Sequence, residues 1–156
     1  MKRITGGVTA AAGFQAASVA AGIKYKDRKD MAMIFSEAPC HVAGTFTTNV
    51  VKAAPVQWDS QVLDSGAKVQ AIVVNSGIAN ACTGKEGFGY CKETADAAAR
   101  ALSIPADGVM VGSTGVIGMQ LPIEKLTAGI EALAEKKSAS VESGTEAAKA
   151  IMTTDT

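Results

Sequence analysis

Aromatic side chains are scarce in this sequence: they make up 4% of its 156 residues, although apolar residues account for 47%. A core built from this composition must consist of Ala, Val, Ile, Leu and Met. Side chains of this size imply close packing of backbones, with burial against a partner as a further way to cover apolar surface. The length is that of one domain, so we expect residues 1–156 to form a single domain.

The sequence has no excess of charge of either sign, because 15 basic residues balance 15 acidic ones. It contains no basic patch of the kind that binds nucleic acid, and no acidic tail. We therefore expect a small-molecule ligand or a protein partner, and no nucleic-acid partner.

Paired cysteines and long apolar runs are also missing. Cys40, Cys82 and Cys91 are odd in number and have no paired spacing, which favours neither a disulfide framework nor a zinc site. Reduced thiols are typical of a cytosolic protein, so we expect a cytoplasmic location and no metal site. Glycines and polar residues interrupt residues 10–22, so neither a signal peptide nor a membrane span is expected.

The apolar runs that are present alternate with helix-type patterns, which predicts an α/β or α+β layered domain. Strands are predicted at residues 31–35, 41–48, 69–74 and 109–111. Helices are predicted at residues 55–63, from about residue 86 to 103, from Pro122 through Leu133, and from Ser143 to Met152. Thr83-x-x-Glu86 and Ser143-x-x-Glu146 have the spacing of capping boxes.

Two glycine-containing segments follow predicted strands, at residues 75–84 and 112–118. The carboxyl ends of strands are where ligands collect in open α/β sheets. Glycine lets a ligand approach the backbone closely, and Thr114 adds a hydroxyl there. A hydroxyl beside a free backbone N–H can hold an oxygen that becomes negative during acyl transfer. On these residues alone, a tight strand-to-loop corner remains the simpler interpretation.

Two other chemistries are weaker alternatives. A phosphate-binding loop would need four residues between its glycines, but six separate Gly77 from Gly84, and Glu86 stands where Ser or Thr should follow the lysine. A cysteine hydrolase would need Cys82 and His41, the only histidine, in contact in the fold. The simpler readings are a small packed cysteine and a structural or solvated histidine.

Several segments together resemble the ornithine acetyltransferase family, the bifunctional glutamate N-acetyltransferases of arginine biosynthesis. The resemblance is carried by GGVTA at 6–10, TFTTN at 45–49, AAPV at 53–56, NSGIANACTG at 75–84, STGVIG at 113–118 and IMTTDT at 151–156. Ile78 departs from the asparagine that is usual in the fourth of these motifs.

The resemblance implies an α/β fold of mixed sheets and packed helices that a second chain, β, completes. Enzymes of this family cleave themselves within a Met-Ala-Thr sequence, and the new N-terminal threonine of β is the nucleophile. The present sequence has no Met-Ala-Thr, so it corresponds to most of an α chain. The implied reaction moves an acetyl group from N-acetylornithine to glutamate in an α2β2 enzyme, without cofactor or metal. Some members also use acetyl-CoA.

The resemblance also assigns roles to individual residues. Thr114 and Gly115 match the oxyanion hole, and Thr153 matches a threonine that contacts substrate. Residues 75–84 are expected near the site as structural support. The competing class is a non-enzymatic binding or scaffold module, in which the glycine segments are only corners.

Overall fold

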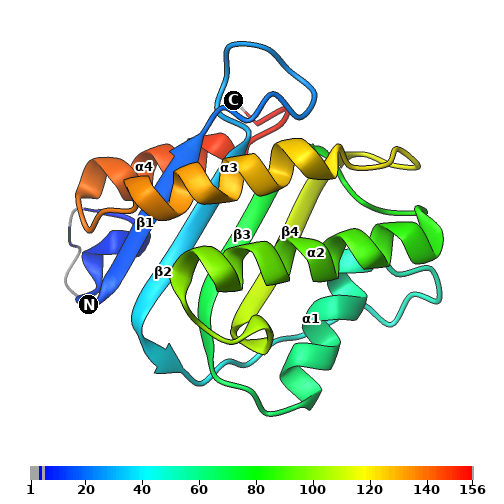
Figure 1. The fold of residues 1–156 in the computed structure, drawn as a ribbon, viewed down its shortest axis with the longest axis horizontal. Coiled ribbons are helices and arrows are strands. Elements are labelled where there is room, and N and C mark those ends of the chain that lie inside the picture. Colours follow the sequence, from blue (N-terminus) through cyan, green and yellow to red (C-terminus); the bar gives the residue numbers. More distant parts are fainter. Residues whose placement is uncertain (1–3, 5, 156) are drawn as a thin grey trace.

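Four strands form one mixed sheet in the order β1-β2-β3-β4 (Figure 1). The computed structural model describes residue 4 and residues 6–155. The strands are β1 (Phe14–Val19), β2 (Met31–Cys40), β3 (Val69–Ile78) and β4 (Val109–Val116). The first three strands pair antiparallel, whereas β4 runs parallel to β3. A parallel pair needs a long crossover, which here contains helix α2 (Gly84–Leu102).

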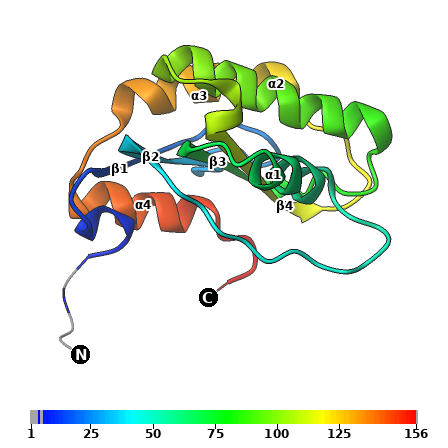
Figure 2. The same cartoon turned by 90° about the horizontal axis from the view of Figure 1, so that it is seen from below.

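The helices form a layer on each side of the sheet (Figure 2). α2 and α3 (Ile123–Lys136) cover one face, and α4 (Val141–Ala150) lies on the other face against β1 and β2. α1 (Ala54–Asp64) packs beside β4. Two short 3-10 helices, η1 (Val8–Ala10) and η2 (Ala106–Gly108), complete the regular structure of the described residues. The layered α/β class expected from the sequence is confirmed.

The face under α2 and α3 holds the larger apolar side chains. Met31, Met33 and Val73 alternate along their strands toward this face and are fully buried. A Cβ added at Gly129 of α3 would lie 2.5 Å from the sulfur of Met31, so α3 crosses β2 at very close range. The small side chains of the sequence therefore allow the close approach that its composition indicated.

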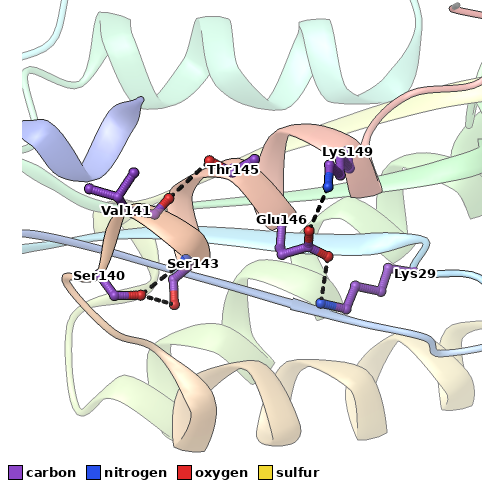
Figure 3. A network of polar contacts seen from close by, with 7 residues as sticks. All are labelled: Lys29, Ser140, Val141, Ser143, Thr145, Glu146 and Lys149. Carbon is purple, nitrogen blue, oxygen red and sulfur yellow. Dashed lines mark hydrogen bonds and ion pairs between the residues drawn. The ribbon is translucent and has the colours of Figure 1, made fainter. Parts of the chain in front are cut away.

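The opposite face holds a small cluster made of alanines. Its buried members are Ala16, Ala32, Ala147 and Ala150. Polar contacts at the surface of α4 add to this packing (Figure 3). The carboxylate of Glu146 pairs with the Nζ atoms of Lys29 and Lys149 at 3.0 and 2.9 Å. These two ion pairs tie α4 to the loop before β2 and to its own last turn.

The ends of several elements differ from those predicted. Residues 41–48 form no strand; they belong to an irregular connection between β2 and α1, and only the strand propensity of Val, Phe and Thr had favoured a strand there. β1 was not predicted, because its small residues gave no clear apolar run. Residues 75–78 and 112–116 extend β3 and β4 rather than forming loops. α4 ends at Ala150, two residues before the predicted end.

Neither predicted capping box forms. The Thr83 hydroxyl donates to the side-chain oxygen of Asn80 instead of capping α2. In α4 the cap is Ser140, whose hydroxyl oxygen accepts from the backbone N–H of Ser143 at 3.1 Å (Figure 3). Glu146 is engaged in its ion pairs. In both cases the side chains found other partners: a neighbouring amide for Thr83, and Lys149 together with the distant Lys29 for Glu146.

Candidate active site

The parallel ends of β3 and β4 form the backbone of the site. The ladder continues to the pairs Gly77–Gly115 and Ile78–Val116, so the predicted glycine turn is a strand. A Cβ on Gly115 would lie 2.2 Å from the carbonyl carbon of Gly77, and the φ angle of Gly115 is +135°. Only glycine fits this approach. Glycine at position 115 therefore allows β3 and β4 to stay paired up to their ends, because a Cβ there would push the two strands apart.

The hydrogen bonds along β4 show which way its peptide groups point. The N–H of Val111 donates to Asp59 Oδ1 at 2.9 Å, and the indole N–H of Trp58 donates to the carbonyl of Val109 at 3.0 Å. Both groups face α1, away from β3. The carbonyl of Val116, in contrast, accepts from Ala79 on the side of β3. Because peptide groups alternate along a strand, the N–H of Gly115 is directed to the outer edge.

A hollow of about 530 Å³ opens beside Thr114. Its lining residues come from the two strands and from the segment after α4: Val74, Gly112, Ser113, Thr114, Ala148, Ile151, Met152 and Asp155. In the sequence, Thr153 lies between Met152 and Asp155, although it does not itself line the hollow. The structure thus brings Thr114 and the segment that contains Thr153 to one place, and Gly115 follows Thr114 in β4 without lining the hollow itself. Thr156 lies outside the described residues, as do residues 1–3 and 5.

Two contacts hold the end of α4 and the segment after it in this position, and a third lies within the segment. The hydroxyl of Ser76 donates to the carbonyl of Ala150 at 2.7 Å, in the buried end of β3. The guanidinium of Arg28 donates to the carbonyl of Met152. The N–H of Thr153 donates to Asp155 Oδ2 at 3.0 Å. Asp155 thereby closes a local turn.

Residues 79–84 build a buried polar network behind the site. The side-chain amide of Asn80 donates to the carbonyl of Gly87 at 2.8 Å and to the sulfur of Cys91 at 3.2 Å. Burial, and then the nearby charge of Asp59, raise the pKa of Cys91 to about 12. A thiol with this pKa carries almost no thiolate at neutral pH, so Cys91 is a packing residue.

The cysteine-hydrolase pair does not assemble. His41 contacts the Nζ atom of Lys68, just before β3 begins, whereas Cys82 follows the other end of that strand. A ten-residue strand is about 30 Å long. The two side chains therefore lie at opposite ends of β3, and a shared catalytic role for them is wrong.

Sequence reasoning missed Trp58 and Asp59, and it placed Asn75 and Ser76 near the site only as part of the supporting segment 75–84, without a role of their own. The available signal was the continuation of the apolar run at 69–74 by two polar residues, which the structure buries within the strand. Asp59 is partly buried, and desolvation raises its pKa to about 6 despite the hydrogen bond from Val111. No sequence spacing indicated that α1 would place this carboxyl against β4.

Other kinds of site find less support in the described residues. Over residues 4 and 6–155, no group of three or more His, Cys, Asp or Glu side chains gathers to hold a metal ion. Among the helices in that part of the chain, none has both the length and the apolar character needed to cross a membrane.

Comparison with known proteins decides the family. The model of the ArgJ family matches residues 15–156. The chain belongs to the ArgJ family. It is 52% identical to the arginine biosynthesis bifunctional protein ArgJ of Gloeobacter violaceus over 153 residues, which is 97% of this chain and 37% of that protein. It is 51% identical to ArgJ of Mycobacterium tuberculosis over 155 residues, 96% of this chain and 38% of that protein.

Solved structures confirm the fold. The ornithine acetyltransferase of M. tuberculosis, solved in complex with ornithine, matches with a TM-score of 0.92 and 51% identity, covering 96% of this chain and 80% of that one. ArgJ of Bacillus halodurans matches with a TM-score of 0.91 and 42% identity, covering 97% and 78%. The chain spans less than two fifths of the length of the ArgJ proteins that it matches.

Proposed function

We propose that this chain is the α-chain portion of an acetyltransferase that moves an acetyl group from N-acetylornithine to glutamate in arginine biosynthesis. The observation that carries the proposal is the close approach of Gly115 to Gly77 beside the hollow that Thr114 lines; strand alternation then directs the Gly115 N–H to the outer edge. Membership of the ArgJ family and the names of the matched relatives support the same activity.

In the proposed mechanism this chain supplies the oxyanion hole. A threonine hydroxyl on a β chain attacks the acetyl carbonyl of N-acetylornithine, and its own α-amine or a nearby group takes the proton. The carbonyl oxygen becomes negative and accepts hydrogen bonds from the Thr114 hydroxyl and the Gly115 N–H. Ornithine leaves with a proton on its nitrogen, and glutamate then attacks the acetyl-threonine through the same geometry. Thr153 contacts the substrate.

The partner in this proposal is the downstream part of the same polypeptide. Cleavage of one precursor would give α and β chains, which assemble as α2β2 in the cytoplasm. The part of the sheet face that α4 leaves open supports such a partner, because Ile72 is 37% exposed there although its neighbours Ala71 and Val73 are buried. Acetyl-CoA is a second acetyl donor to be tested, and the proposed chemistry uses no cofactor or metal.

The replacement Thr114→Val tests the proposal in the full-length protein. Valine keeps the shape of threonine and removes the donor. Because the hydroxyl acts mainly on the transition state, we expect kcat to fall on the order of 100- to 1,000-fold with little change in KM. Thr94→Val is the matched control, because the Thr94 hydroxyl donates to the carbonyl of Tyr90 within α2.

Precursor cleavage is checked first on a gel, because it passes through a similar intermediate. A processed Thr114→Val enzyme with normal kcat would mean that the glycine segment is purely structural, as in the scaffold alternative. A raised KM with unchanged kcat would make Thr114 a substrate-binding residue only.

A further inference from the structure

Asn75 is a polar residue buried inside the sheet, directly behind the proposed oxyanion hole. Its side chain is 2% exposed, and in the ladder it pairs with Ser113 of β4. A carboxamide costs free energy to bury unless both its oxygen and its nitrogen find partners. The hydrogen-bond partners of the Asn75 side chain therefore indicate its structural role.

Each end of the Asn75 carboxamide holds a different strand end. The nitrogen Nδ2 donates to the carbonyl of Ile78 at 2.9 Å, three residues later in β3. The oxygen Oδ1 accepts from the hydroxyl of Ser113 at 2.6 Å, across the ladder in β4. One side chain thus bridges the two strands, three residues before the ladder ends at Ile78 and Val116.

Both of these contacts lead to Gly115. The bond from Asn75 to Ile78 encloses Gly77, whose φ angle is +104° and whose carbonyl lies against Gly115. The bond to Ser113 fixes β4 two residues before Gly115. The peptide that carries the Gly115 N–H is therefore held from its neighbouring strand and from its own strand by the same carboxamide.

We propose that Asn75 is a positioning residue that acts through Ser113 and Gly77 to aim the Gly115 N–H and to fix Thr114. The proposal rests on the proposed function, since it needs an oxyanion at this place. Oxyanion donors act only when they are held in the geometry of the transition state. A displacement of about 1 Å at such a site lowers the rate on the order of 100-fold.

The test compares Asn75→Ala, Ser113→Ala and the double variant in the full-length protein, with N-acetylornithine and glutamate as substrates. We expect kcat to fall about 10- to 100-fold in Asn75→Ala, with KM within about 3-fold of the parent value. Ser113→Ala should show a smaller fall. The double variant should be no worse than Asn75→Ala, because the two side chains share one interaction.

Two further measurements separate positioning from mere stability. Ser113→Thr keeps the donor hydroxyl and should recover most of the kcat lost in Ser113→Ala; if Asn75→Ala fails to fold, this pair carries the test alone. Thr94→Val removes the hydrogen bond that the buried Thr94 makes within α2 and should lower the melting temperature while leaving kcat unchanged. A kcat loss that simply tracks melting temperature across all variants overturns the proposal.

Comparison with Thr114→Val keeps the two hypotheses apart. If Thr114→Val loses kcat but Asn75→Ala and Ser113→Ala do not, the oxyanion hole stands and the role of Asn75 is refuted. If Thr114→Val keeps its kcat, the proposed function fails at its own test, and the proposal for Asn75 fails with it.

Discussion

The two faces of the sheet are built by the same four strands but are covered differently. Under α2 and α3 lie long apolar side chains, among them Met31, Met33, Ile130 and Leu133, all fully buried. Under α4 lie alanines, and the face continues past α4 as a hollow of about 470 Å³ that reaches Ile34 and Val74. Large side chains fill one side of the sheet, whereas small ones leave room on the other.

This difference in how the two faces are covered determines where the candidate site lies. The closed face stabilises the strands by burial, while the open face brings the end of α4 close enough for residues 151–155 to reach Thr114. A bulky core beneath α4 would hold that segment farther from β4. The half-covered face therefore combines a surface that a downstream chain can bury with the hollow in which we place the chemistry.

Truncating matched isoleucines gives the largest expected contrast between the faces. Ile130→Ala on the closed face should lower the free energy of unfolding by about 2–5 kcal/mol, because Ile130 is 0% exposed and leaves a cavity. Ile72→Ala on the open face should cost less than about 1 kcal/mol in the 156-residue chain. Urea titrations followed by circular dichroism measure both.

The Ile72→Ala variant also tests whether a downstream chain covers this part of the open face. In the full-length protein, Ile72→Ala should cost more than about 2 kcal/mol, since a downstream chain would bury the side chain there. Equal costs in the short and full-length proteins would argue that this half of the face stays exposed.

A second, smaller contrast concerns how α4 begins. Ser140→Ala removes the hydroxyl that caps the N–H of Ser143 and should lower the free energy of unfolding by about 1 kcal/mol. Ser143→Ala, at the position that the sequence pattern had favoured as the cap, should cost only a few tenths. Thermal unfolding of the two variants distinguishes the caps, and the reverse order would restore the capping box at Ser143.

The smallest effect is expected at the covered edge of β4, where Asp59 meets Val111. Burial raises the pKa of Asp59 to about 6, above its value near 4 in an unfolded chain. The folded state thus favours the protonated form, so the contribution of Asp59 to stability falls as pH rises from about 4 through 6. Because the carboxyl is partly exposed, the loss should be on the order of 1 kcal/mol or less.

Asp59→Asn keeps an oxygen to accept from Val111 and removes the titration. The stability difference between parent and variant should therefore change between pH 4 and 7 in urea titrations. A difference that stays constant over this range would show that Asp59 does not titrate there.

Local patterns were sufficient to predict much of the fold. The strand core at 69–74, the helix that begins near Pro55 and the helix after Pro122 all formed close to their predicted bounds. Each depends on a periodic apolar pattern or on proline, which act over a few residues. The capping boxes failed because Thr83 donates to Asn80, three residues earlier, and because Glu146 pairs with Lys29, 117 positions away, as well as with Lys149. No short spacing reveals the contact between Glu146 and Lys29.

The sequence by itself determined which residues could carry the chemistry, through the order and composition of short motifs containing Thr114, Gly115 and Thr153. Tertiary structure decided how they meet. The glycine segment became a strand because Gly77 lies against Gly115, and the alternation of its peptide groups follows from the ladder and from the Asp59 contact at the edge. Such contacts join residues 38 positions apart (Gly77 and Gly115) and 52 positions apart (Asp59 and Val111). Their geometry depends on packing of whole elements, which local sequence patterns do not encode.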